Sequence, residues 1–369
     1  MNRYHDAMER CAPDEGLRER LEKGVRSARP ERARTYRPRR KKTAVLLLAA
    51  VLLLATSATT IWDPLFIRRF GPGAALSALG GAVFQEVNVT SVCDDVSLTV
   101  TQALCSDRTI HYILKYRLPD GFSLGEGEYL SSPGRDLYYG TGDYTWEEFK
   151  AAEGDIWQNY DWSTNLSFGD YFDRDGFVLG PYDLTHSKDG NGNTSGSGRS
   201  KGYDPETNTI TWMFSYDFNT GWDLTEQPMT ILVTPPCIET EDGTRTAVTD
   251  HPAIVTFQPA YDGPQARSGV FQEGDVKITA TLSTFSLALE AQGTDYPWYD
   301  DMVKDTRLVK ADGSEQPVGL MGFTNGGSGI AGVDSGKAEE VSTTVHFILL
   351  TDISEYTAVR MGDYELPLS

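Results

Sequence analysis

Cysteine is scarce in this chain of 369 residues, which contains only four. Three of them, Cys93, Cys105 and Cys237, follow the longest apolar run, and an odd number leaves at least one thiol unpaired or bridged to another chain. Cys93 and Cys105 flank a predicted strand and could pair with each other as a disulfide. No second cysteine pair stands at zinc-finger spacing, which disfavours a structural zinc site.

Catalytic motifs are also missing. Neither Ser195, Ser197 nor Ser328 has glycine at both −2 and +2, so the nucleophile elbow of the α/β-hydrolases is absent. The chain has no H-E-x-x-H zinc motif and no phosphate-binding loop. His111 and His346 lie inside predicted strands, where a satisfied structural histidine is commoner than a catalytic one. We therefore expect no enzyme activity.

A calcium loop is matched only in its first positions. Asp189, Asn191 and Asn193 alternate as calcium ligands do, but Thr194 stands where the loop needs glycine and Ser200 where it needs glutamate. The sequence therefore predicts no metal and no cofactor, and an acidic solvated loop explains these residues.

Charge is absent from Thr43 to Trp62, and this run divides the chain. Its 19 residues from Ala44 to Trp62 span about 28 Å as a helix, close to the roughly 30 Å of a hydrocarbon core. We predict a transmembrane helix over 43–62, with Trp62 at the membrane interface. A cleaved signal peptide ending near Ser57 and a buried core helix are the alternatives.

The orientation follows from a basic cluster before the run, which predicts a cytoplasmic N-terminus and an extracellular C-terminal part. Its members are Arg37, Arg39, Arg40, Lys41 and Lys42. Residues 1–42 hold 14 basic and 7 acidic side chains, a net charge of +7, whereas the part after residue 62 holds 19 and 46, a net charge of −27. A strongly acidic exterior part disfavours nucleic acid and anionic surfaces as partners there, so we expect no nucleic-acid partner.

The cytoplasmic segment has one short apolar stripe. Leu17, Leu21 and Val25 recur at helical spacing, and about 40 residues are too few for an independent core. The stripe belongs either to a solvated helix or to a helix that docks into a groove on a cytoplasmic partner.

Glycines interrupt the connector at residues 63–85, so no long stalk helix is expected there. We expect Phe66, Ile67 and Phe70 to rest on the bilayer, while Arg68 and Arg69 reach the lipid head groups.

Beyond residue 85 the pattern predicts a mainly β fold made of two immunoglobulin-like β-sandwich modules, at 86–264 and 265–369. We expect loops at Lys188–Lys201 and Gly322–Gly336. The expected strands are Val96–Thr101, Thr109–Arg117, Asn208–Tyr216, Met229–Thr234, Ala253–Gln258, Asp275–Ser283, Phe285–Glu290, Thr306–Lys310, Val341–Leu350, Ala358–Met361 and Tyr364–Leu368.

The first module carries an aromatic insertion at 121–201. It contains one predicted helix, Trp146–Ala152, preceded by a capping box of Thr145 and Glu148. Its aromatic residues, among polar neighbours, either pack against their own sheet or stack on a sugar or peptide ligand. The candidates for ligand contact are Tyr144, Trp146, Trp157 and Trp162.

The segment FQEVNVTSVCDDVSLTVTQALCSDRTIHYILKYRLPDG (84–121), placed after a basic run and one span, resembles a group of Gram-positive single-pass membrane proteins. The ending YTAVRMGDYELPLS (356–369) is similar to the close of their C-terminal β domain. These proteins carry an ectodomain of unknown function and are often described as anti-sigma factors.

The resemblance implies that the cytoplasmic segment binds an extracytoplasmic-function sigma factor and that the ectodomain senses an envelope ligand. This chain departs from the zinc-binding anti-sigma type, because His5 and Cys11 lack the motif's further cysteine. The alternative is a membrane-anchored surface module that binds glycan or protein and has no cytoplasmic signalling role.

Overall fold

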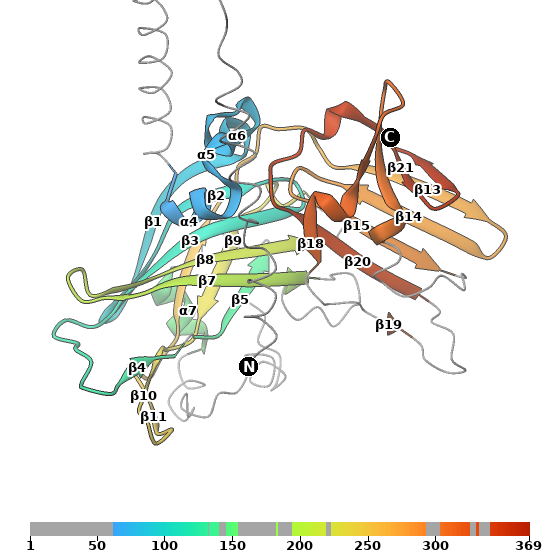
Figure 1. Ribbon diagram of the computed structural model, residues 1–369. Helices are drawn as coiled ribbons and strands as arrows, with labels where there is room; N and C mark the ends of the chain where they lie inside the picture. The colour runs from blue at the N-terminus through green and yellow to red at the C-terminus, as the bar shows by residue number, and fades with distance from the viewer. Residues whose placement is uncertain are drawn as a thin grey trace, which may run out of the picture. The chain divides into compact units, whose positions relative to one another are not determined.

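The structure is a computed structural model, and it shows a mainly β chain with several antiparallel sheets (Figure 1). The predicted span up to Ile61, the basic cluster and the Leu17, Leu21 and Val25 stripe lie outside the residues it describes. None of the described helices is long and apolar enough to cross a membrane. The described residues are 62–131, 133–139, 145–153, 182–183, 194–218, 223–292, 303–324, 330–331 and 340–369.

The N-terminal β region, residues 84–262, contains three of the antiparallel sheets. The five-stranded sheet has the order β1 (Phe84–Cys93), β2 (Val96–Cys105), β3 (Thr109–Arg117), β8 (Thr209–Phe218), β7 (Thr194–Asp204). The four-stranded sheet has the order β12 (Ala253–Phe257), β9 (Met229–Val233), β5 (Arg135–Tyr139), β6 (Tyr182–Asp183). The small sheet has the order β11 (Arg245–Ala247), β10 (Cys237–Glu239), β4 (Tyr129–Leu130).

Strand β3 is buried on both faces over its first six residues. Its even-numbered side chains, such as Tyr112 and Leu114, join the core shared with β9 and β12, whereas Ile113 joins a second cluster with the residues that follow the predicted span. Successive side chains of a strand point to opposite faces of the sheet. The even-numbered and odd-numbered side chains of β3 are therefore buried by different parts of the protein. This explains why β3 reads as a continuous apolar run and not as an alternating one.

Strand β2 changes parity in its middle. Leu98 and Val100 face the main core, but so do Ala103 and Cys105, which have the opposite parity. A register shift between Val100 and Gln102 accounts for the change, since a β-bulge adds one residue to one strand.

The C-terminal β region, residues 263–369, has two further sheets around its own apolar core. One has the order β13 (Arg267–Glu273), β14 (Val276–Leu282), β15 (Ser286–Gln292), β20 (Glu340–Phe347), β18 (Gly322–Thr324), with β19 (Ile330–Ala331) also on β20. The other has the order β17 (Glu315–Pro317), β16 (Thr306–Lys310), β21 (Tyr356–Met361), β22 (Tyr364–Pro367). Two short 3-10 helices, η3 (Val318–Leu320) and η4 (Ile353–Glu355), complete the region.

The connector forms three short helices, α4 (Pro64–Phe70), α5 (Pro72–Leu76) and α6 (Ala78–Val83), as the glycines predict. The expectation that its aromatic residues rest on a bilayer is wrong for Phe66 and Phe70. Both are buried in a cluster with Leu104, Met213 and Phe285. The β-sheet offers them an apolar face, so they pack there.

Trp62 is buried in the protein as well. It is 4% exposed and lies against Phe66 and Phe84. The next residue, Asp63, caps α4 with its side chain, donates its backbone N–H to Gln102 and forms a 2.8 Å ion pair with Lys201. The folded body therefore already includes the last residue of the predicted span.

The strands predicted at Thr109–Arg117 and Thr306–Lys310 are confirmed at both ends, and the other predicted strands are found within a few residues of their expected limits. Helix α7 (Trp146–Glu153) is also confirmed with its capping box, in which Thr145 and Glu148 exchange hydrogen bonds.

Both predicted loops are partly wrong. Strand β7 begins at Thr194, inside Lys188–Lys201, and pairs with β8 along its length. Strands β18 and β19 fall inside Gly322–Gly336. Glycine is depleted in strands, but pairing with a long neighbouring strand outweighs this preference.

The burial of Phe66 gives a direct test. Replacing Phe66 by Ala should lower the free energy of unfolding of the full chain by about 3–5 kcal/mol, because it empties a fully buried site. The matched control is Leu76→Ala, since Leu76 is 46% exposed on a neighbouring helix and should change stability little. Urea unfolding in detergent micelles measures both. Equal small effects would show that Phe66 contacts lipid and not the sheet.

Candidate functional site

The candidate site lies where the two β regions meet, and we call it the junction. It is made by the β2–β3 turn (Ser106–Arg108), the end of β8 at Asp217, the β14–β15 turn (Ser283–Ser286) and His346 on β20. The elements come from both sides of residue 263, so the junction exists only when both regions are folded.

A short contact between His346 and Asp217 at the centre of the junction connects the two regions. Nδ1 of His346 lies 2.5 Å from Oδ2 of Asp217, and both side chains are about 7% exposed. The other oxygen, Oδ1, accepts a hydrogen bond of 2.5 Å from the Thr109 hydroxyl. Burial alone would raise the pKa of Asp217, but His346 and the other groups around the carboxylate lower it to about 2. The carboxylate of Asp217 is therefore charged, and it contacts both His346 and Thr109.

Beside this pair, His111 is enclosed by aromatic rings. Its ring centroid lies 5.0 Å from that of Phe70 on α4 and 4.7 Å from that of Phe285 in the β14–β15 turn, both edge-on. Neither ring nitrogen has a hydrogen-bond partner among the described residues. Burial lowers the pKa of His111 to about 3; Asp217 opposes this shift, and Arg69 and His346 add to it. His111 is therefore neutral, and its ring packs β3 against α4 and the β14–β15 turn.

The β2–β3 turn is fixed by its own polar contacts. Ser106 accepts the backbone N–H groups of Arg108 and Thr109, and the carboxylate of Asp107 accepts the backbone N–H of Ala266 at 2.7 Å. Burial raises the pKa of Asp107, although the hydrogen bond from Ala266 acts the other way. The turn thus holds the chain segment that leads into the C-terminal β region.

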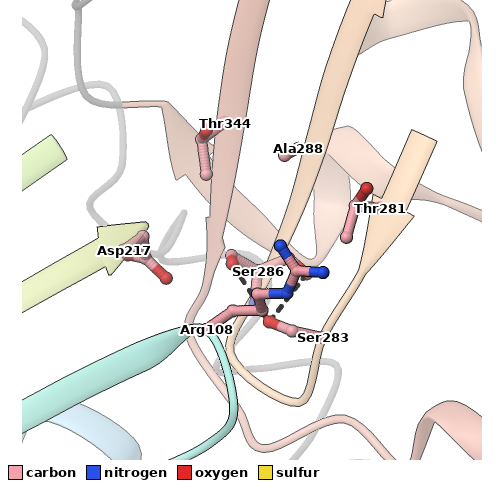
Figure 2. Close-up of a pocket in the computed structure, with 7 residues that line it drawn as sticks. All are labelled: Arg108, Asp217, Thr281, Ser283, Ser286, Ala288 and Thr344. Carbon is pink, nitrogen blue, oxygen red and sulfur yellow. Dashed lines mark hydrogen bonds between the residues drawn. The ribbon is translucent and has the colours of Figure 1, made fainter. Parts of the chain in front are cut away.

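A small pocket opens at the junction, and Arg108 reaches from the β2–β3 turn toward Ser283 and Ser286 (Figure 2). It encloses about 10 Å³, which is room for about one water molecule. Seven residues line it: Arg108, Asp217, Thr281, Ser283, Ser286, Ala288 and Thr344. Its wall is thus rich in hydroxyl groups and has one guanidinium group.

This arrangement suits cohesion and recognition better than proton transfer. Both oxygens of Asp217 are occupied, by His346 and by Thr109. A general base must also be within reach of a substrate, and the Asp217 side chain is only 7% exposed. No group of three or more metal-ligating side chains is gathered in the described ranges.

Of the four aromatic residues expected to contact a ligand, the structure describes only Trp146, and it places that ring inside the protein. Trp146 is 4% exposed, stacks on Phe149 and lies against His251. For this residue the packing interpretation is the right one. Tyr144, Trp157 and Trp162 lie outside the described residues.

The disulfide that the sequence left open between Cys93 and Cys105 is not formed. Both thiols are free and buried. Cys93 pairs with Val96 at the start of β2, whereas Cys105 is the last residue of that strand. Nine residues of extended chain separate their ends by roughly 30 Å, far beyond disulfide reach.

Sequence reasoning missed Arg108 and Asp217 altogether. His346 is a satisfied structural histidine, as predicted, but His111 is buried without a hydrogen-bond partner in the described part of the chain. One signal was available: Thr211, Ser215 and Asp217 put polar groups on one face of β8. From the sequence alone, that pattern indicates a solvated face. In the structure, segments that are distant in the sequence cover these side chains and bury them.

No family model matches this chain, and no curated protein matches it significantly. Among solved structures, the chain is similar to the crystal structure of the conserved domain protein from Bacillus anthracis. The TM-score is 0.36 and the identity 12%, over 75% of this chain and 75% of that chain. A TM-score this low carries no argument about fold or function.

The state of His111 predicts a pH dependence. An unfolded histidine with a pKa of 6.5 binds a proton that folded His111, with a pKa of about 3, does not bind. The free energy of unfolding should therefore fall as the pH drops from 6.5 toward 3, by at most about 1.4 kcal/mol per pH unit. Asp217 adds a separate loss between 3.8 and about 2, where its folded pKa lies.

Replacing His111 by Phe keeps the ring packing and should flatten the slope of stability between pH 6.5 and 4.5. Urea unfolding at several pH values measures it. Ile113→Val is the control, because it changes the same cluster without a titratable group and should keep the wild-type slope. An unchanged slope in the His111→Phe variant would contradict the burial of a neutral His111.

Proposed function

We propose that this chain is a single-pass membrane regulator of the anti-sigma type. Residues 1–42 would lie in the cytoplasm and bind an extracytoplasmic-function sigma factor through Leu17, Leu21 and Val25. Residues 43–62 would cross the lipid bilayer, and the two β regions, as immunoglobulin-like sandwiches, would form an extracellular part that senses an envelope ligand. The protein would have no catalytic role.

Charge supports this proposal. The net charges of +7 before the apolar run and −27 after it suit two different compartments. The five basic residues beside the run favour a cytoplasmic N-terminus. Residues 84–121 and 356–369 resemble membrane proteins that are described as anti-sigma factors. We therefore propose a sigma factor as the cytoplasmic partner.

The observation that carries the proposal furthest is the burial of Trp62. A surface display module needs only a loose tether, whereas a regulator must pass a change in its ectodomain to the span. Here the folded body includes Trp62 and Asp63, at the very end of the apolar run. Phe70, on the helix that begins at Pro64, lies against the junction. A change at the junction would reach the end of the run through packed side chains.

The alternative, a surface module that binds glycan or protein through the aromatic segment, has less support. Trp146 is buried, and residues 125–201 include β5, a central strand of its sheet. Deleting that segment would remove the fold together with any ligand site. Trp157→Ala and Trp162→Ala are therefore the better variants for testing ligand binding.

Co-purification tests the proposal. The tagged full chain, extracted in detergent from the membrane fraction of its own cells, should bring down a sigma factor. Replacing Leu17, Leu21 and Val25 together by Glu should reduce the recovered sigma factor at least tenfold. These changes keep a helix-forming residue at each site but remove the apolar stripe. Glu22→Ala, outside the stripe, is the matched control and should retain the partner.

A sigma factor that is absent from the wild-type eluate, while the chain is abundant, would contradict the proposal. So would equal recovery with the triple variant. Deleting residues 1–36 distinguishes the two proposals further. If the chain is a regulator of the anti-sigma type, the deletion should abolish regulation. If it is a surface-binding module, the deletion should leave the phenotype unchanged.

A further inference from the structure

The guanidinium group of Arg108 keeps access to solvent and has few partners in the described part of the chain. The side chain is 23% exposed, and its one ion pair in the described part of the chain is a long contact of 3.9 Å between Nε and Asp107. That carboxylate already accepts the backbone N–H of Ala266. Arg has five N–H donors in a planar fork, so the outer edge of the fork is left for a partner outside the chain.

The pocket places hydroxyl groups around this fork (Figure 2). Ser283 and Ser286 hydrogen-bond each other, and Thr281 shares a hydrogen bond with Ser268. Thr344 also lines the pocket. Hydroxyl groups can donate to an oxygen that the guanidinium group attracts. Arg108 from the N-terminal β region and hydroxyl groups from the C-terminal β region thus line one small space.

We propose that this pocket binds the carboxylate group of a small or peptide-like ligand, with Arg108 as its charged partner and the Thr344 hydroxyl as a second donor. A carboxylate fits the fork of Arg in a bidentate manner. The enclosed space of about 10 Å³ admits the end of such a group but not the body of a larger one. The rest of the ligand lies outside the pocket.

The charges around the pocket favour a monoanion. Asp217 forms part of the wall, and its carboxylate lies 2.5 Å from Nδ1 of His346. A doubly charged phosphate group would meet Asp217 and the nearby Asp107 at close range, which costs more than a single charge does. A carboxylate therefore suits the site better than a phosphate group.

The ligand would hold the two β regions together, since Arg108 precedes residue 263 and Thr344 follows it. The inference deepens the proposed function, because it gives a chemical class to the envelope ligand. It does not depend on the sigma factor, and its test uses no cytoplasmic partner, so either proposal can fail alone.

The test measures the binding of sodium acetate to the full chain in detergent micelles, with inorganic phosphate as a second probe and chloride as the reference at equal ionic strength. Saturation-transfer NMR on the acetate methyl group reports binding directly. We expect saturable binding in the millimolar range, weakened at least tenfold by Arg108→Gln and several-fold by Thr344→Val. Arg117→Gln is the control, because Arg117 is 56% exposed and pairs with Asp120.

Acetate binding no stronger than the chloride reference would overturn the proposal, and so would saturable binding that Arg108→Gln leaves unchanged. Arg108-dependent binding of phosphate without acetate would overturn the assignment to a carboxylate. Thr344→Val keeps the test valid if Arg108→Gln does not fold, since it removes one hydroxyl group from a side chain that is only partly buried.

Discussion

The structure depends on one buried charge. The carboxylate of Asp217 sits at the meeting point of the two β regions and has partners from both, Thr109 and His346. An ionised carboxylate away from water is stable only with such partners, and losing either would leave an uncompensated charge in the interior. The β2–β3 turn, the β14–β15 turn and the end of β20 are therefore held in one arrangement.

Aromatic packing extends this constraint to the connector. His111 stands between Phe70 and Phe285, so one residue of the five-stranded sheet touches both α4 and the C-terminal β region. Phe66 and Trp62 continue the same cluster toward the predicted span. The chain after Ile61 thus begins inside a packed core, and this is the physical basis for proposing communication along it. The pocket at Arg108 adds a place where a ligand could bias that arrangement.

Much of the secondary structure could be predicted from the sequence, because β3 and β16 contain β-branched residues and α7 begins with a capping box. The junction could not. Asp217, Ser215 and Thr211 share one face of β8, and their polarity favours solvent until distant segments cover them. The bulge after Val100 reverses the parity of β2, and the register of β1 on β2 places Cys93 and Cys105 at opposite ends. These facts depend on long-range pairing, which local patterns do not determine.

Calorimetry of the full chain tests most directly whether the junction makes the connector and both β regions one cooperative unit. We expect a single thermal transition whose calorimetric and van't Hoff enthalpies agree. Replacing Phe285 by Ala removes the ring that touches both Phe70 and His111, and it should split the transition in two. Two separate transitions in the wild-type chain, unmoved by this substitution, would contradict a cooperative junction.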